Sequence, residues 1–196
     1  MRFALCKAMN FRLDIPFVSA FLGSAYALAG RVQEGIPLLQ QAVDATTSMK
    51  LVSNRSWLLM QLGEAHLIAG RADEASGLID QALDLAVRHE ERGWEAWGLH
   101  LRGEVHARSV RPALDRALDA YNEAAVRAEA LKMKPLLAHC DLSRGKVYGH
   151  AGDKNEANRY LKTALTSIRE MDMRFWLDTA ERDRELLSAC LARGVG

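Results

Sequence analysis

Apolar residues follow helical spacing along the chain, in short runs interrupted by glycine. The runs on either side of Gly30 contain Phe17, Phe21, Leu22, Ala25 and Leu28, and then Leu38, Leu39, Ala42 and Val43. Residues three and four positions apart share one face of an α-helix, so each run predicts one amphipathic helix. Glycine after the first run favours a tight turn at the end of a helix. The pattern therefore predicts a helical hairpin.

This hairpin recurs about four times. Glycines inside the first helices are 40, 40 and 42 residues apart, at Gly23, Gly63, Gly103 and Gly145, and a second glycine follows three of them seven residues later, at Gly30, Gly70 and Gly152. Such periods are typical of stacked units that cannot bury their apolar faces alone. We therefore predict an all-α protein, an α-solenoid of about four helical hairpins with a period of roughly 40 residues.

The two kinds of glycine predict two different roles. Those at the turns are expected to adopt the left-handed conformation that ends a helix. Those inside the first helices cost roughly 1 kcal/mol each relative to alanine, which implies close backbone approach and hairpins that close tightly. On the second helices, a bulky residue precedes an alanine by three positions, at Leu39, Ile79, Tyr121 and Leu161 and at Ala42, Ala82, Ala124 and Ala164. This alternation predicts small-into-large packing between helices.

Three local departures from the repeat carry predictions of their own. Asp153 and Glu156 have the spacing of a capping box at the start of a second helix. Pro37 lies several residues past Gly30, so a kink or a delayed helix start is expected there. In the third unit, ARSVRPALD replaces the glycine turn and adds two residues. This change predicts a protruding loop, with Pro112 in the first turn of the next helix.

We expect a single domain over residues 1–196. Residues 1–14 have the pattern of the end of a preceding second helix, residues 15–50, 51–91, 92–133 and 134–172 form the repeats, and residues 174–193 form a capping helix. The last helix has Phe175, Trp176, Ala180, Leu187 and Leu191 available to cover the stack. Because the chain begins within an ongoing repeat pattern, we expect it to be a fragment of something longer.

Composition narrows the classes of partner. The chain has 196 residues, of which 49% are hydrophobic and 26% charged, and a formal net charge of +1. These values fit a soluble protein without electrostatic attraction to nucleic acid or an anionic membrane. No apolar run has the length of a membrane span or the form of a signal peptide. Three widely spaced cysteines, Cys6, Cys140 and Cys190, indicate reduced thiols, so the cytoplasm is the expected compartment.

The last unit has the signature residues of a known repeat family. Gly145, Tyr148, Ala157, Leu161 and Ala164 follow the order small, aromatic, alanine, bulky, alanine, which resembles the tetratricopeptide repeat (TPR). The resemblance covers about four units, and the first unit departs from it at Gly35, where alanine is usual. It implies a right-handed superhelix that binds ligands along a concave surface formed by the first helices. The family period is shorter, about 34 residues, so longer helices are expected here.

A more specific resemblance spans nearly the whole chain. The segments AYALAGR, LGEAHLIAGR, LKMKPLLAHCDLSRGKVY and MDMRFWLDTAE resemble the C-terminal TPR region of bacterial class III adenylate/guanylate cyclase and ATPase signalling proteins. This resemblance implies that the chain senses or relays a signal. It places the catalytic and nucleotide-binding machinery in a preceding region.

Residues at equal phase on the first helices give a candidate binding groove. Six residues before each repeat glycine stand Phe17, Trp57, Trp97 and His139, and one residue after it stand Ser24, Glu64, Glu104 and Lys146. Aromatic faces beside Glu64 and Glu104 would suit an apolar or basic peptide segment. The alternative is that the aromatic rings pack adjacent helices as core.

Other site chemistries find little support in the sequence. His66 and His106 share the phase of Tyr26 and Tyr148 and are interpreted as replacements for a buried ring, and no histidine or cysteine spacing indicates a metal site. The segment around Arg144-Gly145-Lys146 lacks the first glycine of a phosphate loop. Lys146 is the only lysine in its column, which disfavours a clamp for acidic peptide tails. We predict no catalytic residues, no cofactor and no metal.

The function expected from the sequence is a non-enzymatic module that binds a protein or peptide. Two alternatives stay open, a superhelix that senses a small ligand and a scaffold for homodimerisation. An enzyme is the least favoured class, because no catalytic constellation is specified.

Overall fold

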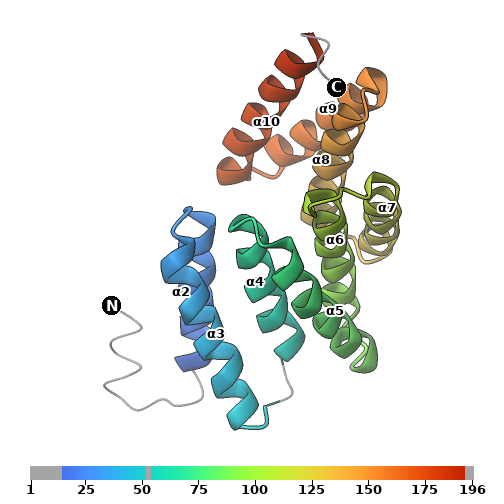
Figure 1. Ribbon diagram of the computed structural model, residues 1–196. Coiled ribbons are helices and arrows are strands. Elements are labelled where there is room, and N and C mark those ends of the chain that lie inside the picture. Colours follow the sequence, from blue (N-terminus) through green and yellow to red (C-terminus); the bar gives the residue numbers. More distant parts are fainter. Residues whose placement is uncertain (1–14, 52–53, 193–196) are drawn as a thin grey trace. The chain divides into compact units, whose positions relative to one another are not determined.

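The computed structural model describes residues 15–51 and 54–192, and in this part of the chain every regular element is an α-helix (Figure 1). The helices are α2 (Ile15–Leu28), α3 (Val32–Ser48), α4 (Arg55–Ile68), α5 (Ala72–Arg88), α6 (Arg92–Arg108), α7 (Leu114–Ala130), α8 (Lys134–His150), α9 (Lys154–Glu170) and α10 (Arg174–Ala192). Among the described residues, no helix is long and apolar enough to cross a membrane. The all-α prediction is confirmed.

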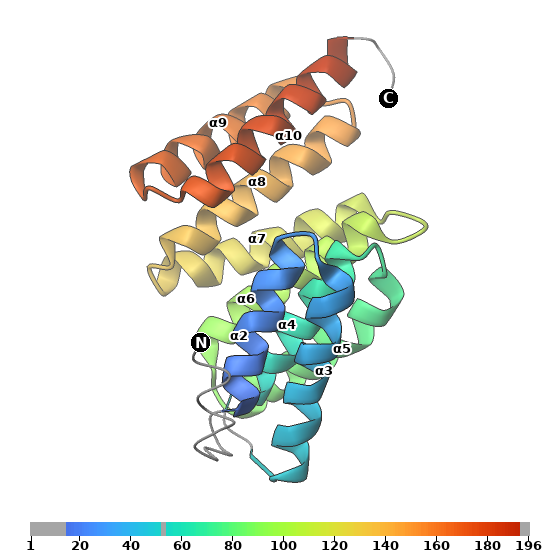
Figure 2. The ribbon, with the colours of Figure 1, turned by 90° about the vertical axis from the view of Figure 1, so that its left-hand side faces the viewer.

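The helices form two compact units, which divide within α6. The first comprises the chain up to Trp94 together with Arg108–Val110, and the second comprises Glu95–Ala107 and the chain from Arg111 onward. In the first unit, α2 packs on α3, α4 packs on α5, and α4 also contacts α2 and α3. In the second, α8 packs on α7 and α9, and α10 packs on α8 and α9 (Figure 2). A single domain over residues 1–196 stays a prediction.

The hairpins close where a glycine of the first helix meets a bulky residue of the second. A methyl group added at Gly23, Gly63 or Gly145 would lie within 3 Å of side-chain carbons of Leu39, Ile79 or Leu161, and one added at Gly103 would overlap the ring of Tyr121. These four bulky side chains are almost completely buried. The predicted close approach is confirmed, and the partner in each hairpin is the bulky residue of its second helix.

Both kinds of turn use the left-handed backbone region. Gly30, Gly70 and Gly152 have φ of 79°, 73° and 83°, which confirms their predicted role. The turns between successive hairpins, and the turn before α10, use residues other than glycine in the same region, namely Lys50, Glu90, Lys132 and Asp172. After each of them, the next N–H bonds a carbonyl five residues back, as in Leu51 N to Thr46 O at 2.9 Å. This bond caps the preceding helix where the sequence shows no glycine signal.

Gly35, where the first unit departs from the TPR pattern, lies at a backbone contact. A methyl group there would be 2.5 Å from the Gly23 carbonyl oxygen and 3.0 Å from the Ala27 nitrogen. In the second hairpin, a methyl group at Gly63 would be 3.6 Å from the carbonyl oxygen of Ala75, the counterpart of Gly35. The departure at Gly35 therefore permits α2 and α3 to touch through their backbones.

The predictions for the two prolines, Pro37 and Pro112, each need a correction. Helix α3 runs from Val32 to Ser48 with Pro37 inside it, so a delayed start is wrong. Pro112 precedes α7 instead of lying in its first turn, because the loop closes through a bond from Ala113 N to His106 O at 3.0 Å. The loop itself is exposed as expected, with Val110 91% exposed.

Only one half of the capping box forms at the start of α9. The side chain of Asp153 accepts a bond from Glu156 N at 3.1 Å, which satisfies an N–H group of the first turn. The Glu156 carboxylate pairs with Arg159 at 2.5 Å. The reciprocal bond of the box is replaced by this ion pair.

Helix α10 covers the last hairpin, as predicted. Its Ala180 is buried in a core with residues of α8 and α9, and Trp176 and Leu177 pack against that core. Phe175, by contrast, is 53% exposed. The prediction for residues 1–14, and the side chains of Leu187 and Leu191, lie outside the described residues.

Glycine substitutions test the backbone contact in the first hairpin. Gly35→Ala should lower the free energy of unfolding by about 1–3 kcal/mol, because its methyl group forces α2 and α3 apart. Gly77→Ala is the matched control, since nothing lies within 4 Å of a methyl group at this exposed helical position. The control should stabilise by about 0.5–1 kcal/mol through helix propensity. Urea unfolding followed by circular dichroism measures both, and an equal gain from the two variants would contradict the contact.

Candidate functional site

Four aromatic rings lie together in the first unit and are called here the aromatic cluster: Phe17 and Phe21 of α2, Trp57 of α4 and Trp94 in the first turn of α6. Phe17 and Phe21 are four residues apart and so lie on one face of their helix. The Phe17 and Trp57 rings stack at 6.4 Å, and Trp57 also contacts Phe21 at 4.9 Å and Trp94 at 6.4 Å. Trp57 is therefore the ring that contacts the other three.

The aromatic cluster reaches the surface through α2. Phe21 is 65% exposed and Leu28, on the same face of α2, is also exposed, while Phe17, Trp57 and Trp94 are half-buried. Sequence phase identified Phe17 and Trp57 and missed Phe21 and Trp94. The sequence could have indicated Phe21, because it follows Phe17 by one helical turn and so lies on the same face of α2. Trp94 lies at a different phase and only the fold brings it to Trp57.

A hydrogen-bonded pair borders the cluster one turn further along α2 and α4. Ser24 Oγ donates to Gln61 Oε1 at 2.6 Å. Glu64, the candidate carboxylate on α4, is half-buried three residues beyond Gln61. The edge of the cluster is thus polar, and the Glu64 carboxylate lies about two turns beyond Trp57 on α4.

The other two members of the aromatic column lie in the second unit. Trp97 and His139 contact each other with ring centres 5.5 Å apart, and Trp176 of α10 meets His139 edge-on at 4.6 Å. His139 is only 8% exposed. The structure thus brings Trp97 and His139 together, and Trp176 of α10 packs against His139.

Glu104 is engaged in a hydrogen-bond network inside the second unit. Its Oε1 accepts bonds from Tyr121 Oη at 2.8 Å and from Ser143 Oγ at 2.6 Å, and His100 Nε2 lies 4.0 Å from the same oxygen. The Glu104 side chain is 12% exposed. Its carboxylate therefore links α6, α7 and α8, and a role in ligand binding stays a prediction.

A serine, a histidine and a glutamate in contact invite comparison with a nucleophilic triad. In a triad, the base contacts the serine through one ring nitrogen and the acid through the other. Here Ser143 Oγ donates to Glu104, and the same nitrogen of His100 faces both the serine, at 3.2 Å, and the acid. This geometry ties helices together and lacks the order needed to activate the serine.

A hydrogen bond between successive first helices, like the one from Ser24 to Gln61, also occurs in the second unit. The residue after a repeat glycine bonds to the next first helix in the pairs Ser24–Gln61 and Glu104–Ser143, and Lys146 pairs with Asp183 of α10 at 2.5 Å. Lys146, the only lysine of its column, is thus committed to an ion pair. Ser24, Glu104 and Lys146 of this column thus each hold two neighbouring helices together.

Burial controls ionisation around His139. Burial, and then the nearby His100, lower the pKa of His139 to about 3, so the ring is neutral at physiological pH. Burial raises the pKa of the adjacent Cys140 thiol to about 12, which keeps it protonated and unsuited to nucleophilic attack. Burial also raises the pKa of Asp141, against the opposing effect of Arg144.

Two histidines interpreted as buried rings, His66 and His106, are only partly buried. Burial lowers the pKa of His66. His106 lines a pocket between α6 and α7. Within the described residues, no group of three or more His, Cys, Asp or Glu side chains is arranged to hold a metal ion.

Comparison with known proteins finds similarity in structure alone. No model of a known protein family matches the sequence, and no curated protein matches it. A Rap protein complexed with Competence and Sporulation Factor is similar with a TM-score of 0.71 and 15% identity, covering 87% of this chain and 52% of its own. The chain thus spans about half the length of that protein.

Two further solved structures have TPR-like repeats. One is a Podosopora anserina protein described as a kinesin light chain, with a TM-score of 0.61 and 16% identity over 91% of this chain and 95% of its own. A single-residue variant of that protein gives a TM-score of 0.60 and 17% identity over 90% and 94% of the two chains. At these identities the comparisons show the fold, which is a TPR-like array of helical hairpins.

The buried neutral His139 predicts a pH-dependent stability. Its pKa is about 3 when folded and about 6.5 when unfolded, so between these values the unfolded chain binds the extra proton. The free energy of unfolding should therefore fall by about 2 kcal/mol more between pH 7 and pH 5 than in His139→Phe, which keeps a ring beside Trp97 and Trp176. Urea unfolding at the two pH values measures this. The exposed His150 provides the control, since His150→Gln should leave the decrease unchanged.

Proposed function

We propose that the chain is a non-catalytic interaction module that binds an apolar segment of a protein or peptide through the aromatic cluster. The observation that carries this proposal is Phe21, which is 65% exposed although it belongs to a contiguous group of four rings. Exposed aromatic groups of this kind are enriched at interfaces, where they supply most of the binding energy.

The helices around the cluster favour binding over simple exposure of apolar surface. Phe17 and Phe21 stand on α2, which packs against both α3 and α4, so the rings are held by regular elements. A binding surface with ordered side chains loses less conformational entropy when it binds a partner. The Ser24–Gln61 pair beside the rings adds polar groups at the rim, which suit the backbone of a bound segment.

The comparisons support the proposal by analogy. The similar Rap protein was solved in complex with Competence and Sporulation Factor, so a protein with this fold holds a partner molecule. The absence of an ordered triad at Ser143 and the protonated thiol of Cys140 favour binding over catalysis.

We place this module in a larger bacterial signalling protein in the cytoplasm. The support is the resemblance of segments such as LGEAHLIAGR and MDMRFWLDTAE to the C-terminal TPR region of class III cyclase and ATPase signalling proteins. In this setting the bound segment would be the signal, and the chain would relay its presence to a catalytic region elsewhere in the protein.

A peptide-display selection against the chain tests the binding surface. Selected peptides should be enriched in apolar residues, and Phe21→Ala should weaken their binding at least tenfold because it removes an exposed ring from the cluster. Trp57→Ala should weaken binding further, since Trp57 contacts the other three rings. Affinity is measured by fluorescence anisotropy of a labelled peptide.

Val126→Ser is the control, because Val126 is an exposed apolar residue of α7 in the second unit. It should leave the affinity unchanged, and circular dichroism should show equal helicity for all variants. Peptides that bind Phe21→Ala and the unaltered chain equally well would refute the assignment of the aromatic cluster. A concentration-dependent mass in light scattering that Phe21→Ala abolishes would assign the cluster to self-association instead.

A further inference from the structure

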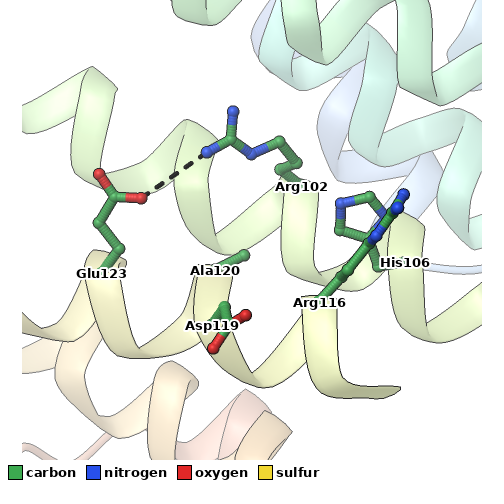
Figure 3. Close-up of a pocket in the computed structure, with 6 residues that line it drawn as sticks. All are labelled: Arg102, His106, Arg116, Asp119, Ala120 and Glu123. Atoms are coloured by element: carbon green, nitrogen blue, oxygen red, sulfur yellow. Dashed lines mark ion pairs between the residues drawn. The ribbon is translucent and has the colours of Figure 1, made fainter. Parts of the chain in front are cut away.

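The third hairpin contains a pocket of about 280 Å³ between α6 and α7, within the second unit (Figure 3). Its lining consists of Arg102, His106, Arg116, Asp119, Ala120 and Glu123. Five of these six side chains are ionisable. The pocket lies between the two helices of one hairpin, and none of its residues belongs to the aromatic cluster.

Position 120 in the pocket lining holds a buried alanine, where the other hairpins have larger side chains. The residue before the bulky one that fills the glycine contact is Leu38, Leu78 and Tyr160 in the other hairpins, and Ala120 in the third. Those larger side chains are half-buried between their helices. Ala120 occupies the same register with a single methyl group, so space remains beside it.

Arginine at position 102 replaces a second apolar residue of the repeat. Its counterparts are Leu22 and Leu62, and in the last hairpin Arg144. Arg144 lies 5.4 Å from the centre of the Tyr160 ring and donates to the Tyr121 carbonyl oxygen at 3.3 Å. Arg102 faces Ala120 where Arg144 has a tyrosine, and it reaches across the pocket to Glu123 at 3.8 Å (Figure 3).

Arg116 reverses the charge found at its register. The corresponding residues in the other hairpins are Glu34, Glu74 and Glu156. In the first and last hairpins this glutamate pairs with a neighbouring arginine, Arg31 or Arg159. In the third hairpin the reversed charge is among the residues that line the pocket, and its side chain extends in the direction of His106 in Figure 3. Ala120 and Arg116, which differ from all three other hairpins, therefore line the same pocket as Arg102, whose arginine is shared with the last hairpin alone.

Both signs of charge line the pocket. Arg102, Arg116 and His106 supply cationic or hydrogen-bonding nitrogen atoms, and Asp119 and Glu123 supply carboxylates. A simple anion in this space would face like charge from the carboxylates, and a simple cation would face the two guanidinium groups. A molecule with separated positive and negative groups is complementary to both sets.

We infer that the pocket in the third hairpin binds a small dipolar ligand of the size of a free amino acid. Its carboxylate pairs with Arg116 and Arg102, because guanidinium groups bind carboxylates through paired hydrogen bonds. Its ammonium group pairs with Asp119. The volume of about 280 Å³ lies just below the range for sites of drug-sized ligands, roughly 300–1,000 Å³, which fits a smaller ligand of this size.

Thermal unfolding in the presence of each of the twenty common amino acids tests the inference. At least one should raise the melting temperature by about 2 °C or more at ten times its dissociation constant. The N-acetyl and amide derivatives of that amino acid each lack one charge, and both should bind at least tenfold more weakly by calorimetry.

Two variants restore the residues of the repeat. Ala120→Leu fills the pocket and should abolish binding, whereas Ala130→Leu, at an exposed position of the same helix, should retain it. Arg116→Glu restores the usual acid and should weaken binding at least tenfold, which provides an independent test if Ala120→Leu does not fold. Lys162→Glu, at an exposed position of α9, is its charge-matched control.

Several results would overturn the inference. They are no stabilisation by any of the twenty amino acids, equal stabilisation by inorganic phosphate or acetate, and unchanged binding to Arg116→Glu. Equal effects of phosphate would show a general oxyanion site, and unchanged binding to the variant would place the ligand elsewhere. Phe21→Ala should leave amino-acid binding intact, so the outcome is independent of the proposed function.

Discussion

Each hairpin is organised by one contact, in which a bulky side chain of the second helix lies against a glycine of the first. Leu39, Ile79, Tyr121 and Leu161 fill this position in turn, and all four are almost completely buried. The contact fixes the distance between the helices and the register of one against the other. Once the register is fixed, the residues on either side of the bulky one have a defined place, and so does every exposed face of the hairpin.

The aromatic residues that stand six positions before each repeat glycine have different surroundings in the two units. Phe17 and Trp57 lie with the exposed Phe21, whereas Trp97 contacts His139, which is buried and meets Trp176 of α10 edge-on. Phase alone places a residue on a face of a helix. Whether that face contacts solvent or another helix depends on the elements that pack against it.

The hairpins and their glycine turns were predictable because glycine requirements are local and recur with the repeat. The left-handed turns at Lys50 and Glu90 were not, since these residues adopt a conformation that their type does not favour, beside the bonds that cap the preceding helices. Trp94 and the pocket beside Ala120 depend on contacts between helices, so spacing along the sequence could not reveal them. The hydrogen bonds of Glu104 were hidden for the same reason, because two of its partners come from other helices.

The third hairpin can differ from the others at position 120 because this residue is not the one that packs against the glycine of the first helix. Tyr121 keeps its place against Gly103, and with it the spacing of α6 and α7. Ala120, the preceding residue, can then lose most of its side chain without releasing the helices from each other. Stability in a helical array is largely a sum of contacts within and between neighbouring repeats, so a hollow at one register costs only that register's packing. A repeat can therefore acquire a pocket at the position next to its main contact while the contact itself maintains the fold.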